Sequence, residues 1–124
     1  MKYLLDANII IYALTGIGDR LRDNVARCSE GDLAISAIAF AEVAKGIGLG
    51  KPPPLAALDA FMEEVTLLPF DAVAAQAYAR LPFRRGSFDR LIAAHALATG
   101  LTLVTSNEAD FADIPGLKIE NWMV

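Results

Sequence analysis

The amino-acid sequence predicts a three-layer α/β/α domain with a mostly parallel central sheet of about five strands. Short apolar segments alternate with longer segments of helical spacing along the chain, and this alternation is typical of a parallel sheet with helices on both faces. The 124 residues suffice for one domain with a real core and are too few for two. No repeat or low-complexity tract divides the sequence, so we expect a single domain over residues 1–124.

The first strand and the first helix meet at an acidic residue. Lys2–Leu5 is short and apolar, Asp6 follows it directly, and Ala7–Leu14 has the character of a helix. Because Asp is a favoured N-cap residue, Asp6 has an ordinary structural role open to it. An acid at the carboxyl end of a first strand also lies where open α/β sheets place their chemistry. A second helix is predicted from Asp19 to about Cys28.

The middle of the chain contains two further strands. Leu33–Ile35 is a short buried strand, and Ser36 holds the N-cap position of a helix through Glu42. The glycines Gly46, Gly48 and Gly50 are expected to end that helix. After three consecutive prolines, Leu55–Glu64 has the apolar spacing of an amphipathic helix, and Val65–Leu68 is a third strand.

The last third of the chain completes the alternation. Gly100 has the position of a helix C-cap, and Thr105 with Glu108 matches a capping box. The predicted elements are, in order, a helix over Ala72–Arg80, a loop over Leu81–Gly86, a helix from Ser87 or Phe88 to Thr99, a strand over Leu101–Val104, a short helix to about Ala112 and an edge strand over Leu117–Glu120.

Composition narrows the class of protein. Hydrophobic residues make up 55% of the chain, above the usual ~45–50%, so we expect an apolar surface that a second copy or a partner covers. No apolar run approaches the ~20 residues that span a bilayer, and Asp6 interrupts any signal peptide, which predicts a cytoplasmic protein. The net charge of −4 counts weakly against a nucleic-acid partner. Cys28 is the single cysteine, so no internal disulfide is expected.

Three acidic residues interrupt otherwise apolar segments. Asp6 ends the first strand, Glu42 lies among small and apolar residues, and Asp89 begins a helix that is apolar on nearly all sides. Each has a structural explanation of its own: an N-cap, an ion pair with Lys45 three residues on, and a first-turn acid that complements the helix dipole. A buried carboxylate, however, must be paired or hold a cation. A site for a divalent cation would explain all three acids together.

Carboxylates without Cys or His ligands favour a hard cation. Mg²⁺ and Mn²⁺ take oxygen ligands, usually one or two carboxylates with water and substrate phosphate, and two such ions ~3.5–4 Å apart can clamp both oxygens of phosphodiester hydrolysis. His95 does not share the helix face of Asp89, so packing or a local hydrogen bond is the preferred interpretation. A phosphoacceptor domain is a further alternative, but no second acid follows Asp6 two positions on.

Short motifs that follow one another across nearly the whole chain resemble those of a known family. They are Leu5-Asp6-Ala7-Asn8-Ile9, Ile35-Ser36-Ala37-Ile38, Ala41-Glu42-Val43, Phe88-Asp89-Arg90-Leu91-Ile92-Ala93-Ala94-His95-Ala96, Leu103-Val104-Thr105-Ser106-Asn107, Asp110-Phe111, Ile114-Pro115-Gly116-Leu117 and Glu120-Asn121-Trp122. In this order and spacing the chain resembles a PIN domain, specifically the VapC-like ribonuclease toxins of type II toxin–antitoxin systems. The resemblance implies a metal-dependent endoribonuclease that a cognate antitoxin neutralises.

The resemblance also assigns roles to individual residues. Asp6, Glu42 and Asp89 look like the three catalytic acids that bind Mg²⁺ or Mn²⁺. The family often has a fourth polar or acidic ligand after the fourth strand, and here that position corresponds to Asn107 or to Asp110.

Residues around the acids match the family less completely. Asn8 and Ser36 correspond to residues that orient the acids, whereas Ala7 and Ala39 stand where the family commonly has a hydroxyl side chain. These departures and the uncharged Asn107 leave an alternative open, a catalytically weak or silent PIN domain that serves as an RNA- or protein-interaction module.

RNA binding is expected to be local because the net charge is negative. Arg84, Arg85 and Arg90, with Arg80 nearby, bracket Asp89 in the sequence and are the predicted phosphate contacts. A solvated surface cluster is the alternative for the two loop arginines. The apolar excess fits the family's habit of forming homodimers and of burying a groove against an antitoxin.

Overall fold

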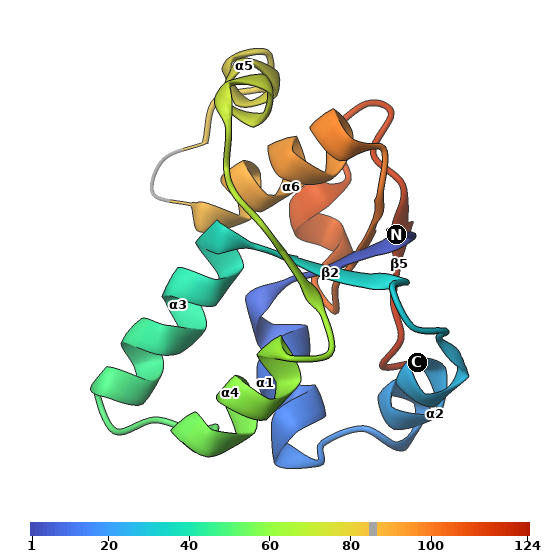
Figure 1. Ribbon diagram of the computed structural model, residues 1–124. Coiled ribbons are helices and arrows are strands. Elements are labelled where there is room, and N and C mark those ends of the chain that lie inside the picture. The colour runs from blue at the N-terminus through green and yellow to red at the C-terminus, as the bar shows by residue number, and fades with distance from the viewer. Residues whose placement is uncertain (85–86) are drawn as a thin grey trace.

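Within the described residues, 1–84 and 87–124, five short strands form a single sheet in the order β3-β2-β1-β4-β5 (Figure 1). The structure is a computed structural model. Each strand pairs with its neighbours in parallel, as predicted. The strands are β1 (Tyr3–Leu5), β2 (Leu33–Ser36), β3 (Thr66–Leu68), β4 (Thr102–Val104) and β5 (Ile119–Glu120).

Helices cover both faces of this sheet. In Figure 1, α1, α2 and α4 lie on one side of the sheet and α6 on the other, as right-handed crossovers require when the chain reverses its direction across the sheet. The helices are α1 (Ala7–Thr15), α2 (Asp19–Arg27), α3 (Ala37–Gly48), α4 (Leu55–Met62), α5 (Ala72–Ala79), α6 (Phe88–Thr99) and the 3₁₀ helix η1 (Glu108–Phe111). The predicted three-layer α/β/α fold is confirmed. Among the described residues, no helix is both long and apolar enough to span a membrane.

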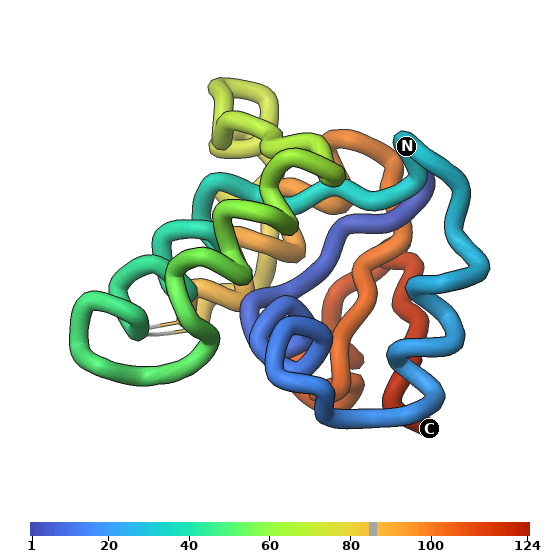
Figure 2. The backbone as a smooth tube through the Cα atoms, turned by 60° about the horizontal axis from the view of Figure 1, so that its bottom comes forward, coloured from blue at the N-terminus to red at the C-terminus, as the bar shows by residue number. Residues whose placement is uncertain are grey.

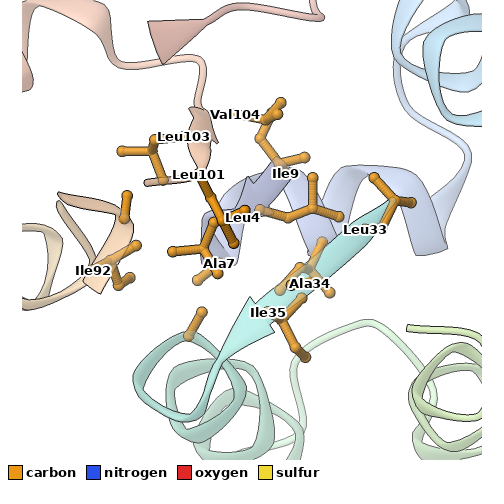
Figure 3. Close-up of a cluster of buried hydrophobic side chains, with 14 of the residues drawn as sticks. Leu4, Ala7, Ile9, Leu33, Ala34, Ile35, Ile92, Leu101, Leu103 and Val104 are labelled. Carbon is orange, nitrogen blue, oxygen red and sulfur yellow. The ribbon is translucent and has the colours of Figure 1, made fainter. Parts of the chain in front are cut away.

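The hydrophobic core lies where the central strands meet α1 and α6. Figure 3 shows Leu4 of β1, Ala34 of β2 and Leu103 of β4 gathered with Ile9 and Ile92 from those two helices. All five side chains are fully buried. Because helices cover both faces of the central strands, these strands are apolar throughout and do not alternate. The rigid core fixes the position of the residues that follow each strand.

The register of the central strands brings three polar residues side by side. Leu5 of β1 pairs with the residue before Ser36 on β2 and with the residue before Thr105 on β4. Asp6, Ser36 and Thr105 therefore form one buried polar row along the carboxyl edge of the sheet. The chain leaves β1 toward β2 and returns on its other side as β4. Asp6 and Thr105 thus flank a topological switch point, where open α/β sheets bind ligands.

The glycines after Glu42 end their helix, as predicted. α3 passes Gly46 and ends at Gly48. Ala39 and Val43 of α3 are buried in the core, and this packing outweighs the cost of a helical glycine, about 0.5–1 kcal/mol relative to alanine.

The short helix after β4 differs from the prediction. Glu108–Phe111 is a 3₁₀ helix whose N-cap residue, Asn107, makes no side-chain capping bond. Thr105 Oγ1 accepts a hydrogen bond from the Asn107 backbone N–H at 3.1 Å, and its hydroxyl lies beside Asp6. The predicted capping box is therefore wrong, because Thr105 belongs to the polar row at the sheet edge.

α5 stands apart from the sheet in both views of the backbone (Figure 2). It packs mainly against α6, and Ala74 is its one buried residue within the described chain. The remainder of this alanine-rich helix is largely exposed.

Candidate active site

Asp6 ends β1 and caps α1. Its Oδ1 accepts a hydrogen bond from the Ile9 backbone N–H at 2.9 Å, which confirms the N-cap role. Burial raises the pKa of Asp6, while the Thr105 hydroxyl and the backbone N–H groups of Ile9 and Asn8 oppose that shift. Capping uses one carboxylate oxygen, Oδ1.

Glu42 lies on α3, six residues after the N-cap Ser36. Its Oε1 is buried and has no hydrogen-bond partner in the described part of the chain. Burial, together with the charges of Asp89 and Asp6, raises the pKa of Glu42 from 4.5 to about 7. No ion pair joins Glu42 to Lys45 among residues 1–84 and 87–124, so the surface ion pair does not explain this acid.

Asp89 occupies the first turn of α6. Burial raises its pKa, the charge of Asp110 raises it further, and the neighbouring Arg90 opposes the shift. The charge of Asp89 in turn raises the pKa values of Asp6 and Glu42. The structure therefore brings the three predicted acids close enough to interact, at the carboxyl edge of the sheet.

The acidic cluster fits a divalent cation. The unpartnered Glu42 Oε1 is a buried acceptor that lacks a donor, and the neighbouring acids add charge that needs compensation. A donor set made only of oxygen atoms suits Mg²⁺ or Mn²⁺. Within the described ranges, no three His, Cys, Asp or Glu side chains are close enough to form a ready-made metal centre. The acids are gathered without forming a complete ligand shell.

Asp110 and Asn107 compete for the fourth ligand position. Both are exposed, on and just before η1. The charge of Asp110 acts directly on Asp89, whereas the backbone N–H of Asn107 is bound to Thr105. The electrostatics therefore favour Asp110.

The two residues predicted to orient the acids have different surroundings. Asn8 acts on Asp6 through its backbone N–H, and its side chain is exposed. Ser36 is fully buried and caps α3, with its Oγ accepting from the Ile38 backbone N–H at 3.1 Å. Ser36 Oγ also lies 2.8 Å from His95 Nδ1, which fits the hydrogen-bonding role expected for that histidine.

Thr105 is a site residue that the sequence-based prediction did not include. Its hydroxyl lies beside Asp6 and opposes the rise in the pKa of that acid. The available signal was the location of Thr105 directly after a strand. That signal becomes informative once β4 is known to pair with β1.

The predicted phosphate contacts have three different outcomes. Arg84 is exposed, and Arg85 lies outside the described residues. Arg90 is only 2% exposed, and its Nη2 donates to Asp113 Oδ1 at 2.7 Å. A buried, paired guanidinium does not reach an RNA phosphate, so the prediction does not hold for Arg90. Successive residues of a helix point about 100° apart, so Arg90 does not point in the same direction as its sequence neighbour Asp89.

Known proteins resemble this chain over nearly its whole length. The PIN domain family model matches residues 3–117. Ribonuclease VapC2 of Rickettsia felis is 34% identical over 98% of both chains. The tRNA(fMet)-specific endonuclease VapC of Shigella flexneri is 31% identical, also over 98% of both.

A solved structure shows the same arrangement in space. The structure of VapBC2 from Rickettsia felis bound to a DNA fragment from their promoter contains a chain that is 32% identical and superposes with a TM-score of 0.82. The superposition covers 98% of this chain and 99% of that one. An acidic cluster at the switch point, a family match over nearly the full length and this agreement in fold lead to one conclusion: the chain belongs to the PIN domain family.

Proposed function

We propose that this PIN domain is a Mg²⁺- or Mn²⁺-dependent endoribonuclease and the toxin of a toxin–antitoxin pair. The observation that carries the proposal is the convergence of Asp6, Glu42 and Asp89 at one edge of the sheet, with Glu42 Oε1 buried and unpartnered within the described chain. Relatives that match over 98% of their length are named as VapC ribonucleases and endonucleases. Both lines point to hydrolysis of RNA phosphodiester bonds.

The chain's own residues divide the work of holding the cation. Asp6, Glu42 and Asp89 would supply carboxylate oxygens, with Asp110 as the further acid beside Asp89. When bound, Mg²⁺ or Mn²⁺ supplies the positive charge that activates a water molecule and stabilises charge on the phosphate. The Ile9 backbone N–H fixes one oxygen of Asp6, and the Thr105 hydroxyl lies beside the same carboxylate, so the acid is oriented before substrate arrives.

RNA phosphates would meet the site through exposed cations near α6. Arg84 is exposed, and its charge lowers the pKa of Asp113, the partner of the buried Arg90. Arg80 at the end of α5 is exposed as well. These side chains place positive charge on a protein whose net charge is −4, so we propose contact with the RNA backbone there.

An antitoxin and a second copy of the chain are the proposed protein partners. One solved structure that this chain resembles is that of VapBC2 from Rickettsia felis bound to a DNA fragment from their promoter. Large apolar side chains on the surface, among them Leu55, Val73 and Phe83, are at least 57% exposed. Exposed apolar side chains mark sites of protein interaction where they form a contiguous patch, and Val73 of α5 and Phe83 shortly after it are the candidates for such a patch.

Cleavage assays with the purified protein test the catalytic proposal. The protein is incubated with RNA in the presence of Mg²⁺ or Mn²⁺ and, in parallel, in the presence of a chelator. The first substrate is tRNA, because one relative is a tRNA(fMet)-specific endonuclease. We expect cleavage that needs the cation and that Asp6→Asn lowers by at least about 100-fold, since it removes a ligand charge. Asp23→Asn is the matched control because Asp23 is an exposed acid on α2.

Two results would contradict the proposal. Full activity of Asp6→Asn would remove that residue from the catalytic set. Absence of cleavage, together with no cation binding by calorimetry even with RNA present, would favour the alternative of a silent interaction module.

A further inference from the structure

A buried hydrogen bond links the two helices that carry Glu42 and Asp89. Ser36 Oγ lies 2.8 Å from His95 Nδ1, although the two residues are 59 positions apart in the sequence. Ser36 is the N-cap of α3, and His95 lies within α6. Both side chains are at most 2% exposed. This contact therefore joins α3 to α6 inside the protein.

The hydrogen bond and the acidic pair lie at matched positions on the two helices. Glu42 comes six residues after Ser36 on α3, and Asp89 comes six residues before His95 on α6. Because Ser36 contacts His95 and Asp89 acts on Glu42, the two helices pass each other in opposite directions. Six helical residues span about 9 Å. The hydrogen bond is thus one contact between α3 and α6, and the acidic pair is another, on a face of α6 turned by about 120° from that of His95.

A contact of this kind sets the register of α3 against α6. A slide of α3 along α6 would break the Ser36–His95 hydrogen bond and would move Glu42 relative to Asp89 by the same amount. Breaking it would leave a hydroxyl and a ring nitrogen buried without this partner, which is costly. α3 and α6 are in direct contact, so a slide of one along the other would change both the hydrogen bond and the spacing of the acids.

The surroundings of His95 hold its ring in place. Phe70, which precedes α5, lies edge-on to the imidazole with ring centroids 5.4 Å apart and planes at 80°. Burial lowers the pKa of His95, and the charge of Asp71 opposes this shift. Ser36 Oγ is itself fixed, since it also accepts from the Ile38 backbone N–H. Both partners of the hydrogen bond are therefore held by independent contacts.

We propose that His95 and Ser36 are positioning residues whose hydrogen bond fixes α3 against α6 and so sets the spacing of Glu42 and Asp89 for the divalent cation. This rests on the proposed function, in which the two acids are cation ligands. This positioning role differs from a purely structural one, in which any side chain of similar shape would suffice at position 95.

Substitutions at position 95 separate positioning from packing. His95→Phe keeps a ring against Phe70 and removes the hydrogen bond. His95→Asn places an amide atom where Nδ1 lies, whereas His95→Gln places it where Nε2 lies. The readout is Mn²⁺ affinity, measured by calorimetry without RNA, together with crystal structures of the metal-free proteins that report the distance between Glu42 and Asp89.

The expected result is a graded loss of affinity. His95→Phe weakens Mn²⁺ binding by about 10-fold or more, as for other residues that orient metal ligands, and lengthens the distance between the two acids. His95→Asn restores most of the affinity and His95→Gln does not. Ser36→Ala combined with His95→Phe is no weaker than Ser36→Ala alone, because both remove one interaction.

A stability control excludes a general effect of loosening the core. Leu21→Ala removes a fully buried side chain from α2, away from α6 in Figure 1, and should lower stability without changing Mn²⁺ affinity. The proposal is overturned if His95→Phe binds Mn²⁺ like the wild type, or if its acids keep their distance. If the wild-type chain binds no Mn²⁺, the proposed function fails, and the metal-free structures still decide whether the hydrogen bond sets the register.

Discussion

At the scale of single residues, Glu42 shows most directly how the fold prepares the site. Its pKa of about 7, against an ordinary 4.5, arises from burial and from the charges of Asp89 and Asp6. Because the folded-state pKa is the higher one, the folded protein binds the proton more tightly than the unfolded chain does. The stability that this gives is complete below about pH 4.5 and is lost as the pH rises to about 7.

Replacing Glu42 with Gln should therefore stabilise the metal-free protein at neutral and alkaline pH. The variant carries no charge to repel Asp89 and Asp6, so its stability should fall less than that of the wild type between about pH 4.5 and 7. Urea unfolding with a chelator present, at about pH 5 and about pH 8, measures the difference. Glu64→Gln, at an exposed acid, is the control. Equal pH dependence in Glu42→Gln and the wild type would contradict this electrostatic account.

Asp110 and Asn107 make a second prediction at this scale. Asp110→Asn should weaken Mn²⁺ binding by several-fold, because the charge of Asp110 acts on Asp89. Asn107→Ala should change it less, since the contact that Asn107 makes with Thr105 uses its backbone N–H. Calorimetric titration of both variants checks the order. A larger loss of Mn²⁺ affinity in Asn107→Ala than in Asp110→Asn would indicate that Asn107 is the fourth ligand.

The three acids could be predicted from the sequence because each interrupts an apolar segment. The role of Thr105 could not, because it depends on β4 lying next to β1, a pairing between distant segments. Arg90 could not be placed either. Its neighbour Asp89 belongs to the site, but Arg90 turns toward Asp113, 23 residues on, and is buried there.

At the scale of elements, the pair formed by Arg90 and Asp113 ties α6 to the segment after η1. Arg90 Nη2 donates to Asp113 at 2.7 Å, and its buried Nη1 has no hydrogen-bond partner within the described residues. The pair thus leaves part of a buried charge unsatisfied. Only Arg90 is buried, since the Asp113 side chain is 39% exposed, so the cost of breaking the pair falls on the guanidinium that would lose its partner.

Two substitutions test this reading of the ion pair. Asp113→Ala removes the partner of a buried guanidinium and should lower the melting temperature by roughly 4 °C or more. Arg90→Met fills a similar volume without charge and should leave the melting temperature unchanged or higher. Thermal unfolding followed by circular dichroism measures both. If Arg90→Met proves the more destabilising of the two, Arg90 makes contacts beyond the pair.

Element boundaries were predictable where local signals agree with packing. Gly100 ends α6 in a left-handed conformation, with φ of 71°, as its C-cap position predicts. α3 likewise ends at Gly48, within the glycine-rich stretch that predicts its end. Thr105 and Glu108 match the capping-box pattern in the sequence, but in the structure the Thr105 side chain lies at the sheet edge beside Asp6 and does not cap the helix.

At the scale of the whole molecule, part of the apolar excess in the composition lies on the protein surface. Hydrophobic residues make up 55% of the chain. Some of them lie on α5, which stands apart from the sheet (Figure 2). Val73 is 58% exposed and Tyr78 is 36% exposed on this helix, and Phe83 beyond it is 84% exposed. α5 packs against α6, but within the described chain it buries only Ala74, so most of its side chains stay exposed. We therefore expect a second copy of the chain to cover α5.

Val73→Glu should convert the resulting homodimer to monomers. A charge at the centre of an apolar contact must be desolvated on association, so dimer affinity should fall by at least about 10-fold. Leu55→Glu is a matched control, because Leu55 of α4 is 57% exposed and Val73 58%, and it should leave the dimer intact. Sedimentation velocity over a range of concentrations distinguishes the two species. If the dimer persists in Val73→Glu but dissociates in Leu55→Glu, the dimer interface lies on α4 and not on α5. If the wild-type protein is a monomer, the proposed occupant of the α5 surface is the antitoxin instead.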